Sequence, residues 1–183
     1  MATIREALAD RRMPYSIGAL NMTKEVNIGG LIRGANAFLM REVIYIGEHD
    51  YPQYAAVGAD QLETVHHFPT TAAFLAWLET TGRPLVCIEQ TPTSVALQEA
   101  DIPEGAILML GQELFGTPPE LVERAALCVE IPQFGRVGSL NVVMAGTVVM
   151  YELASRYHFG RERFRLPEGH SFKPGGKPKR HGE

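Results

Sequence analysis

The sequence predicts a single α/β domain built on a parallel sheet. Short apolar runs that suit buried strands alternate along the chain with segments whose apolar residues recur at helical spacing. The runs are continuously apolar and are bounded by turn residues, which is typical of strands that are covered on both faces. With 183 residues, the chain is long enough to bury one core and too short for two.

The first half of the chain contains three predicted strands, at residues 16–20, 43–46 and 65–68. After the first strand, Asn27 stands where a helix N-cap is expected, and apolar residues follow it at helical spacing. A second helix is expected to begin at Thr70 or Thr71, after the third strand. Residues 50–62 have no clear pattern, so no element is predicted there.

The second half contains three more predicted strands, at residues 85–88, 106–110 and 128–131. A helix is expected over residues 118–126, because the two prolines that open this segment suit a first helical turn. A glycine-bearing loop at residues 133–138 then leads into a long apolar helix over residues 139–156.

The distribution of charge separates an acidic body from a basic tail. Residues 1–155 carry nine Lys and Arg against 18 Asp and Glu, whereas residues 156–183 carry eight against three. Prolines and glycines are frequent near the end, which favours a flexible segment. We therefore expect one domain over residues 1–159 and a basic tail over residues 160–183. The tail is expected either to contact nucleic-acid phosphates or only to keep the protein in solution.

Several classes of protein are disfavoured because their patterns are missing. No apolar run reaches the roughly 18 residues that a membrane span needs, and the first residues are too charged for a signal peptide. Cys87 and Cys128 lie in apolar runs, which predicts buried free thiols and suits a reducing cytoplasm. The six histidines lack the spacing of metal ligands, so no metal is expected. The chain also has no Walker A lysine, no Gly-x-Gly-x-x-Gly and no nucleophile elbow.

Three segments at predicted strand–helix junctions carry the remaining polar chemistry, and such junctions are where α/β proteins bind ligands. They are residues 27–33 (Asn-Ile-Gly-Gly-Leu-Ile-Arg), 111–116 (Gly-Gln-Glu-Leu-Phe-Gly) and 131–141 (Ile-Pro-Gln-Phe-Gly-Arg-Val-Gly-Ser-Leu-Asn). Taken singly, the first could be a capped surface helix with a solvated Arg33. The second could be a common turn with a structural Glu113. The third could be a plain N-cap at Ser139 or Asn141.

Taken together, in this order and at these separations, the three segments resemble the motifs of the SpoU/TrmH family of SPOUT RNA 2′-O-ribose methyltransferases. The matching patterns are Asn-x-Gly-x-x-x-Arg-x-Ala, Gly-x-Glu-x-x-Gly and Ile-Pro-x-x-Gly-x-x-x-Ser-Leu-Asn-Val. The resemblance covers residues 16 to about 155, and the third motif is the most specific. It implies an α/β sheet whose C-terminal part forms a trefoil knot, an exception to the rule that chains are not knotted. It also implies S-adenosylmethionine bound in the knot, RNA as the substrate and no required metal.

The family resemblance further assigns roles to single residues. Cofactor contacts would involve Ile88, Gly111, Gly116, Ile131 and Leu140. Arg33 matches the motif arginine that is assigned to catalysis, and the supporting catalytic residues would be Asn27, Glu113, Ser139 and Asn141. The family works as a homodimer in which the C-terminal helix packs against its mate. The apolar stretch at residues 142–150 fits that role, although burial in the core explains it equally well.

The implied reaction moves a methyl group from a sulfonium to a ribose 2′-hydroxyl, which must lose its proton as it attacks. A charged arginine has no lone pair to accept a proton. We therefore expect Arg33 to bind an RNA phosphate and to stabilise the forming alkoxide, while a phosphate or a water molecule takes the proton. Glu113 is expected to brace the cofactor loop.

Two departures from the family pattern bear on the choice of RNA. Gln133 stands where methionine is usual, and Val143 stands where serine is usual. Since the chain is close to minimal in size, we expect tRNA rather than rRNA. One alternative is a catalytically silent, knotted RNA-binding or dimerisation module, although the presence of Arg33, Glu113 and the run at residues 139–141 favours an enzyme. Another alternative is an unrelated nucleotide-binding α/β protein in which the three motifs are coincidental.

Overall fold

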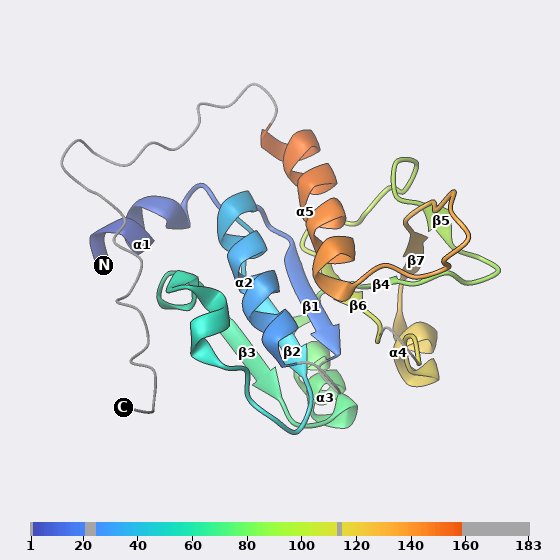
Figure 1. Ribbon diagram of the computed structural model, residues 1–183, viewed down its shortest axis with the longest axis horizontal. Helices are drawn as coiled ribbons and strands as arrows, with labels where there is room; N and C mark the ends of the chain where they lie inside the picture. Colours follow the sequence, from blue (N-terminus) through green and yellow to red (C-terminus); the bar gives the residue numbers. More distant parts are fainter. Residues whose placement is uncertain (1, 21–24, 113–114, 159–183) are drawn as a thin grey trace, which may run out of the picture.

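The computed structural model describes residues 2–20, 25–112 and 115–158, and its strands form one seven-stranded sheet (Figure 1). The strands are β1 (Ser16–Leu20), β2 (Val43–Ile46), β3 (Val65–Phe68), β4 (Leu85–Ile88), β5 (Val95–Ala96), β6 (Ile107–Leu110) and β7 (Leu127–Glu130). Their order across the sheet is β3-β2-β1-β6-β4-β7-β5, and each neighbouring pair is parallel. The predicted parallel α/β sheet is confirmed.

Helices cover both faces of this sheet, so the described part of the chain has three layers (Figure 1). The helices are α1 (Ala2–Ala9), α2 (Val26–Phe38), η1 (Gln53–Ala56), η2 (Ala59–Gln61), α3 (Thr71–Thr81), α4 (Pro119–Arg124) and α5 (Val142–His158). On one face, α2 and α5 pack against each other and, together with β1 and β6, enclose one apolar cluster. On the other face, α3 and α4 close a second cluster. Burial on both faces explains why the strands are continuously apolar.

The two long helices begin at other residues than predicted. α2 starts at Val26, after Glu25, so Asn27 lies in its first turn and is not the N-cap. The reason is that Glu25 already has helical backbone angles and its carbonyl accepts the first helical bond, from the Ile28 N–H at 3.1 Å. α5 starts at Val142, three residues later than predicted, because the side chain of Asn141 accepts a bond from the Val143 N–H at 3.0 Å.

Smaller differences follow from pairing and burial. β7 begins one residue earlier than the predicted strand, because Leu127 pairs with Val86 of β4. α4 ends at Arg124, before the predicted end, and the unassigned residues 50–62 hold η1 and η2. The sequence pattern missed α1 and the two-residue β5. The tail at residues 160–183 lies outside the described residues.

The two cysteines are free thiols that lie opposite each other on β4 and β7. Cys87 is fully buried, as predicted, whereas Cys128 is only half-buried because β7 is less covered than β4. Burial, followed by the neighbouring Cys128, raises the pKa of Cys87 to about 12. The Cys87 thiol is therefore protonated at neutral pH and acts as a small apolar side chain.

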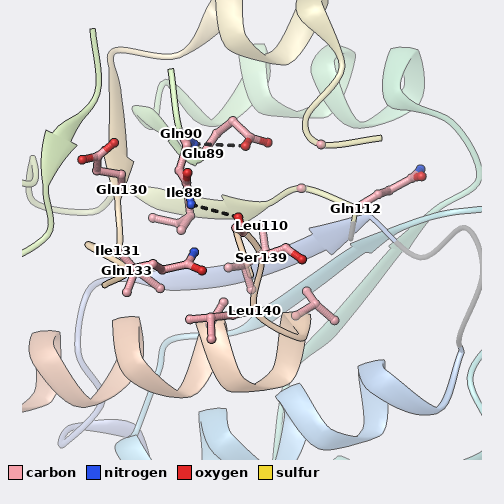
Figure 2. Close-up of a pocket in the computed structure, with 15 residues that line it drawn as sticks. Ile88, Glu89, Gln90, Leu110, Gln112, Glu130, Ile131, Gln133, Ser139 and Leu140 are labelled. Carbon is pink, nitrogen blue, oxygen red and sulfur yellow. Dashed lines mark hydrogen bonds between the residues drawn. The ribbon is translucent and has the colours of Figure 1, made fainter. Parts of the chain in front are cut away.

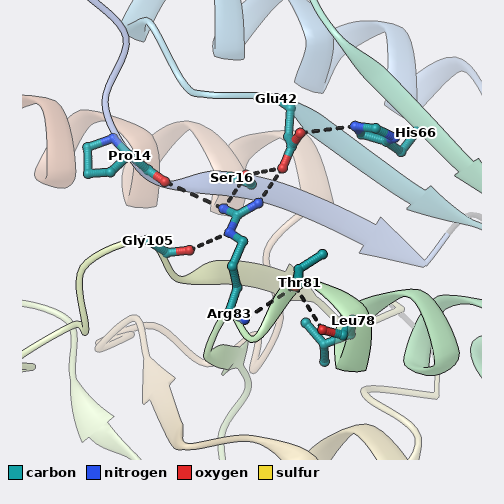
Figure 3. A network of polar contacts seen from close by, with 8 residues as sticks. All are labelled: Pro14, Ser16, Glu42, His66, Leu78, Thr81, Arg83 and Gly105. Carbon is teal, nitrogen blue, oxygen red and sulfur yellow. Dashed lines mark hydrogen bonds and ion pairs between the residues drawn. The ribbon is translucent and has the colours of Figure 1, made fainter.

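A buried ionic network lies at the amino end of the sheet, opposite the strand ends that lead into the three motif loops (Figure 3). Glu42, which is 9% exposed, forms an ion pair with Arg83. The Arg83 guanidinium also donates to Ser16 Oγ at 2.6 Å and to the Gly105 carbonyl at 2.7 Å. Glu42 in turn accepts from Ser16 Oγ at 2.9 Å and contacts His66 Nε2 at 3.0 Å. The network connects the amino ends of five strands, β1, β2, β3, β4 and β6.

The carboxyl of Glu42 is held ionised by this network. Burial acts to raise its pKa, but the hydrogen bonds from Ser16 and Arg83, with the charges of Arg83 and His66, outweigh burial and lower the pKa below the ordinary 4.5. A carboxyl with a lowered native-state pKa stabilises the fold above its unfolded-state pKa. This stabilisation is lost as the pH falls through the native-state pKa.

We predict that Arg83→Met lowers the free energy of unfolding by about 3–5 kcal/mol near neutral pH, because it leaves the Glu42 carboxylate buried without its cation. The deficit should shrink on acidification, since Glu42 becomes protonated in the variant before it does in the parent. Urea denaturation between about pH 7 and pH 4 measures both effects. Arg124→Met on the exposed end of α4 is the matched control and should change stability by less than about 0.5 kcal/mol. A deficit that is the same at every pH would contradict the role given to Glu42.

Candidate active site

Three loops at the carboxyl ends of neighbouring strands enclose a cavity of about 240 Å³ (Figure 2). The loops follow β4, β6 and β7, which lie side by side because β4 pairs with both of the others. The carboxyl edge of a parallel sheet is where ligands of α/β proteins bind. The position of the cavity therefore marks it as the candidate ligand site.

The lining of the cavity combines apolar and polar side chains. The apolar lining consists of Ile88, Leu110, Ile131, Leu140, Val142 and Ala145. The polar lining consists of Glu89, Gln90, Gln112, Glu130, Gln133 and Ser139, and the rest is glycine. Among these described residues there is no Lys, Arg or His, so the charged side chains at the cavity are carboxylates. Such a cavity suits a ligand with a planar apolar part, polar appendages and no net negative charge.

The residues predicted to contact the cofactor lie together at this cavity. All five line it, namely Ile88, Gly111, Gly116, Ile131 and Leu140. Ser139, which was predicted to support catalysis, lines it as well. Residues that are far apart along the chain therefore lie together at one cavity.

The other predicted catalytic residues lie elsewhere. Asn27 on α2 and Asn141 at the start of α5 contact each other, with Asn141 Nδ2 3.5 Å from Asn27 Oδ1, but neither lines the cavity. Arg33 is exposed on α2, and within the described residues its side chain has no hydrogen bond or ion pair. Glu113 lies outside the described residues. The first motif therefore meets the third at the Asn27–Asn141 contact, whereas the guanidinium of Arg33 faces solvent.

A carboxylate that the motifs did not single out braces the loop after β6. Glu89 follows directly after β4, and its Oε2 accepts from the Thr117 N–H at 2.8 Å, while its Oε1 accepts from the Gln90 N–H at 3.0 Å. The sequence prediction gave the bracing role to Glu113. Glu89 could have been found from one signal, namely that it stands immediately after a buried strand, where site residues of parallel sheets gather.

Two more polar contacts connect the walls of the cavity. Gln90 Nε2 donates to the Gly138 carbonyl in the loop after β7, at 3.3 Å. Ser94 Oγ donates to Glu130 Oε2 at 2.6 Å and thereby fixes the turn after β4 to the end of β7. These partners lie in the loops or, in the case of Glu130, at the end of a strand, so the shape of the cavity depends on the bonds that hold the loops as well as on the sheet.

Metal-binding clusters and membrane-spanning helices are both absent from the described residues. Within residues 2–20, 25–112 and 115–158, no group of three or more His, Cys, Asp or Glu is placed to hold a metal ion. In the same part of the chain, no helix has the length and apolar character to cross a membrane.

Comparison with known proteins assigns this fold and cavity to a family. The model of the SpoU rRNA Methylase family matches residues 15–151, a range that contains all three motif segments. A mouse relative, the tRNA (guanosine(18)-2′-O)-methyltransferase TARBP1, is 31% identical over 144 residues, which are 75% of this chain and 9% of that protein. This chain therefore spans only a small part of that curated relative.

Two solved structures have the same fold. The A. aeolicus TrmH/SpoU tRNA modifying enzyme has a TM-score of 0.73 and 26% identity, and the match covers 86% of this chain and 81% of that one. An AdoMet-bound rRNA methyltransferase from Sinorhizobium meliloti has a TM-score of 0.70 and 27% identity, and the match covers 81% of this chain and 59% of that one. The SPOUT-type α/β sheet is thereby confirmed, whereas the trefoil knot stays a prediction. The chain belongs to the SpoU rRNA Methylase family, in agreement with the resemblance of its three motifs.

Proposed function

We propose that the protein is an S-adenosylmethionine-dependent RNA methyltransferase that acts on a ribose 2′-hydroxyl, with tRNA favoured over rRNA. The observation that carries the proposal is the meeting of all five predicted cofactor residues at one cavity. Family membership supports the reaction class. The tRNA preference rests on the names of the mouse relative and of the A. aeolicus structure.

The residues of the cavity fit S-adenosylmethionine. The apolar lining residues, among them Ile88 and Leu140, suit an adenine ring, and the glycines let backbone groups come close to a ligand. Glu89 and Glu130, with no cationic side chain beside them in the described lining, suit a ligand that carries a sulfonium and an ammonium group. When bound, S-adenosylmethionine supplies an electrophilic methyl group.

Residues of the chain itself would bind the RNA and orient the ribose. Arg33 is exposed on α2 without a partner in the described residues, so its planar fork can bind an RNA phosphate. It would hold the ribose in place and stabilise the forming alkoxide, and the proton would pass to a phosphate or to water. Ser139 at the mouth of the cavity, with Asn27 and Asn141 at the junction of α2 and α5, would orient the substrate. Glu113 keeps its proposed role as a brace of the loop.

We also propose a homodimer through the outward face of α2 and α5. Met144, Val148 and Tyr151 recur at helical spacing on α5 and are 58%, 40% and 63% exposed. Val26 on the neighbouring α2 is 48% exposed. A contiguous apolar face of this kind favours a protein interface. Arg33 does not line the cavity of its own chain. In such a dimer, Arg33 would act at the cavity of the second copy.

The remaining parts of the proposal concern organisation and location. Residues 1–159 would be the methyltransferase domain, and residues 160–183 a basic tail that contacts RNA phosphates. We place the protein in the cytoplasm, where free thiols and RNA substrates are found together. The second candidate, a silent RNA-binding or dimerisation module, is separated by calorimetry, because it would not bind S-adenosylmethionine even at millimolar concentration.

We predict that removal of the gene abolishes one ribose methylation in the cellular RNA, and that the mark lies in tRNA. Mass-spectrometric mapping of ribose methylation in total RNA, with and without the gene, measures this. Addition of the purified protein and S-adenosylmethionine to RNA from the deleted strain should restore the mark. An unchanged methylation map, together with RNA binding, would support the silent module.

We predict that Arg33→Lys lowers the rate of methyl transfer at least tenfold, because an ammonium cannot bind a phosphate through two parallel bonds (about 2–4 kcal/mol for a lost charge-stabilising donor). Arg33→Ala should lower it further. Neither should change the dissociation constant of S-adenosylmethionine, since Arg33 does not line the cavity. Arg124→Lys, at an exposed position on α4, serves as the control. Near-full activity of Arg33→Lys would exclude a role that depends on the planar fork.

We predict that Met144→Glu and Val148→Glu convert the dimer into a monomer, because each places a charge in the proposed apolar interface. Light scattering coupled to size-exclusion chromatography measures the mass. Ala76→Glu is the control, since Ala76 is an exposed apolar residue on α3, which covers the face of the sheet opposite α2 and α5. A parent protein that is already monomeric would remove the dimer from the proposal.

A further inference from the structure

We propose that Glu89 and Gln90 form a clasp that positions the other two loops of the cavity and thereby sets the affinity for S-adenosylmethionine. Glu89 and Gln90 are both positioning residues. The inference rests on the proposed function, because it names the groups that shape the cofactor site. Both residues are drawn beside the cavity in Figure 2, where they leave the end of β4.

The first arm of the clasp is the side chain of Glu89. Its backbone N–H donates to the Val129 carbonyl at 2.9 Å, so the residue is fixed to β7 as if the strand continued. Its carboxylate accepts from the Thr117 N–H, immediately after the loop that follows β6. That loop is closed at its base by two bonds of 2.9 Å between the backbones of Gln112 and Gly116. Glu89 therefore holds the closed base of the loop against the end of β4.

The loop leaves a space that the Glu89 carboxylate fills together with Thr117, whose Oγ1 would lie 2.6 Å from a Cβ at Gly111. A Cβ at Gly111 would lie 2.8 Å from Glu89 Oε2, and one at Gly116 would lie 2.9 Å from the same atom. Gly116 also has a φ of +67°, in the region that favours glycine. Two of the predicted cofactor residues are thus glycines whose missing side chains make room for Glu89. The carboxylate and the loop are matched in shape as well as by a hydrogen bond.

The second arm is the side chain of Gln90, which reaches the loop after β7. Its Nε2 donates to the Gly138 carbonyl, next to Ser139 and Leu140 in the lining of the cavity. Consecutive residues of an extended chain point in opposite directions, so Glu89 and Gln90 can reach the two loops from one backbone position. Because both arms end in loops and not in the core, their loss should change the cavity more than the stability of the fold.

The affinity for S-adenosylmethionine, measured by isothermal titration calorimetry on the full chain, tests the clasp. Glu89→Ala should raise the dissociation constant roughly ten- to one-hundredfold, the range for a lost hydrogen bond to a charged group. Glu89→Gln should recover part of the affinity, because its amide oxygen can still accept from the Thr117 N–H. Gln90→Ala should give a smaller rise, of about two- to fivefold. The matched controls, Glu99→Ala and Gln98→Ala, alter exposed side chains after β5 that make no hydrogen bond in the described structure, and should stay within about twofold.

Two further readouts separate positioning from general stability. Hydrogen exchange of the Thr117 amide should become faster in Glu89→Ala and stay unchanged in Glu99→Ala, since only the first loses the acceptor. In the methylation assay, the KM for the cofactor should rise in Glu89→Ala, while the KM for RNA stays the same.

The outcomes distinguish this proposal from the proposed function. A parent protein that does not bind S-adenosylmethionine would overturn both. A parent that binds it, with Glu89→Gln and Glu89→Ala variants that bind equally well, would overturn the clasp and leave the function intact. If Glu89→Ala does not fold, Gln90→Ala decides the matter, because Gln90 is exposed and its loss does not touch the core. Parent-like affinity in Gln90→Ala would then overturn the clasp.

Discussion

The position of β4 between β6 and β7 is the constraint on which the site depends. In this arrangement Ile88 lies beside Leu110 on one side and beside Val129 on the other, so the three strands end at the same level. The loops that follow them consequently leave the sheet together and enclose one cavity. Parallel strands of this kind have both faces covered, and here α5 covers one face of the sheet and α4 the other.

The packing of α2 against α5 brings the first motif into contact with the third. The third motif lines the cavity, whereas Arg33 of the first motif faces solvent. The Asn27–Asn141 contact joins the beginnings of the two helices, near the residues of α5 that line the cavity. Arg33 lies farther along α2 and faces solvent. A guanidinium would be costly to bury without a partner, whereas Glu89 and Glu130 are accommodated at the cavity because backbone and hydroxyl donors satisfy them. The cavity proposed for the cofactor is therefore internal to the chain, whereas Arg33, the residue proposed to bind RNA, lies on its surface.

The buried ionic network and the candidate site lie at opposite ends of the sheet. At the amino end, Arg83 and Glu42 are tied to three strands in a buried network, where removal of one partner leaves a charge without compensation. At the carboxyl end, the polar bonds connect loops, and the residues that make them are half-buried or exposed. Loops held in this way can adapt to a ligand while the sheet stays fixed, since few buried contacts resist their movement.

The sequence by itself determined the parallel α/β sheet and six of its seven strands to within a residue, because these depend on local apolar periodicity. Its motifs also pointed to five of the residues that line the cavity. It could not determine where α2 and α5 begin, since those ends depend on Glu25 and Asn141 hydrogen bonds that form only in the fold. Its position after a buried strand marks Glu89 as a possible site residue, but not as the brace of the loop after β6, because its partner Thr117 is 28 positions away and becomes a neighbour only when β4 pairs with β6. Tertiary structure alone decided which residues face the cavity and which face solvent, because that choice is made by the pairing of strands and the packing of helices across the whole chain.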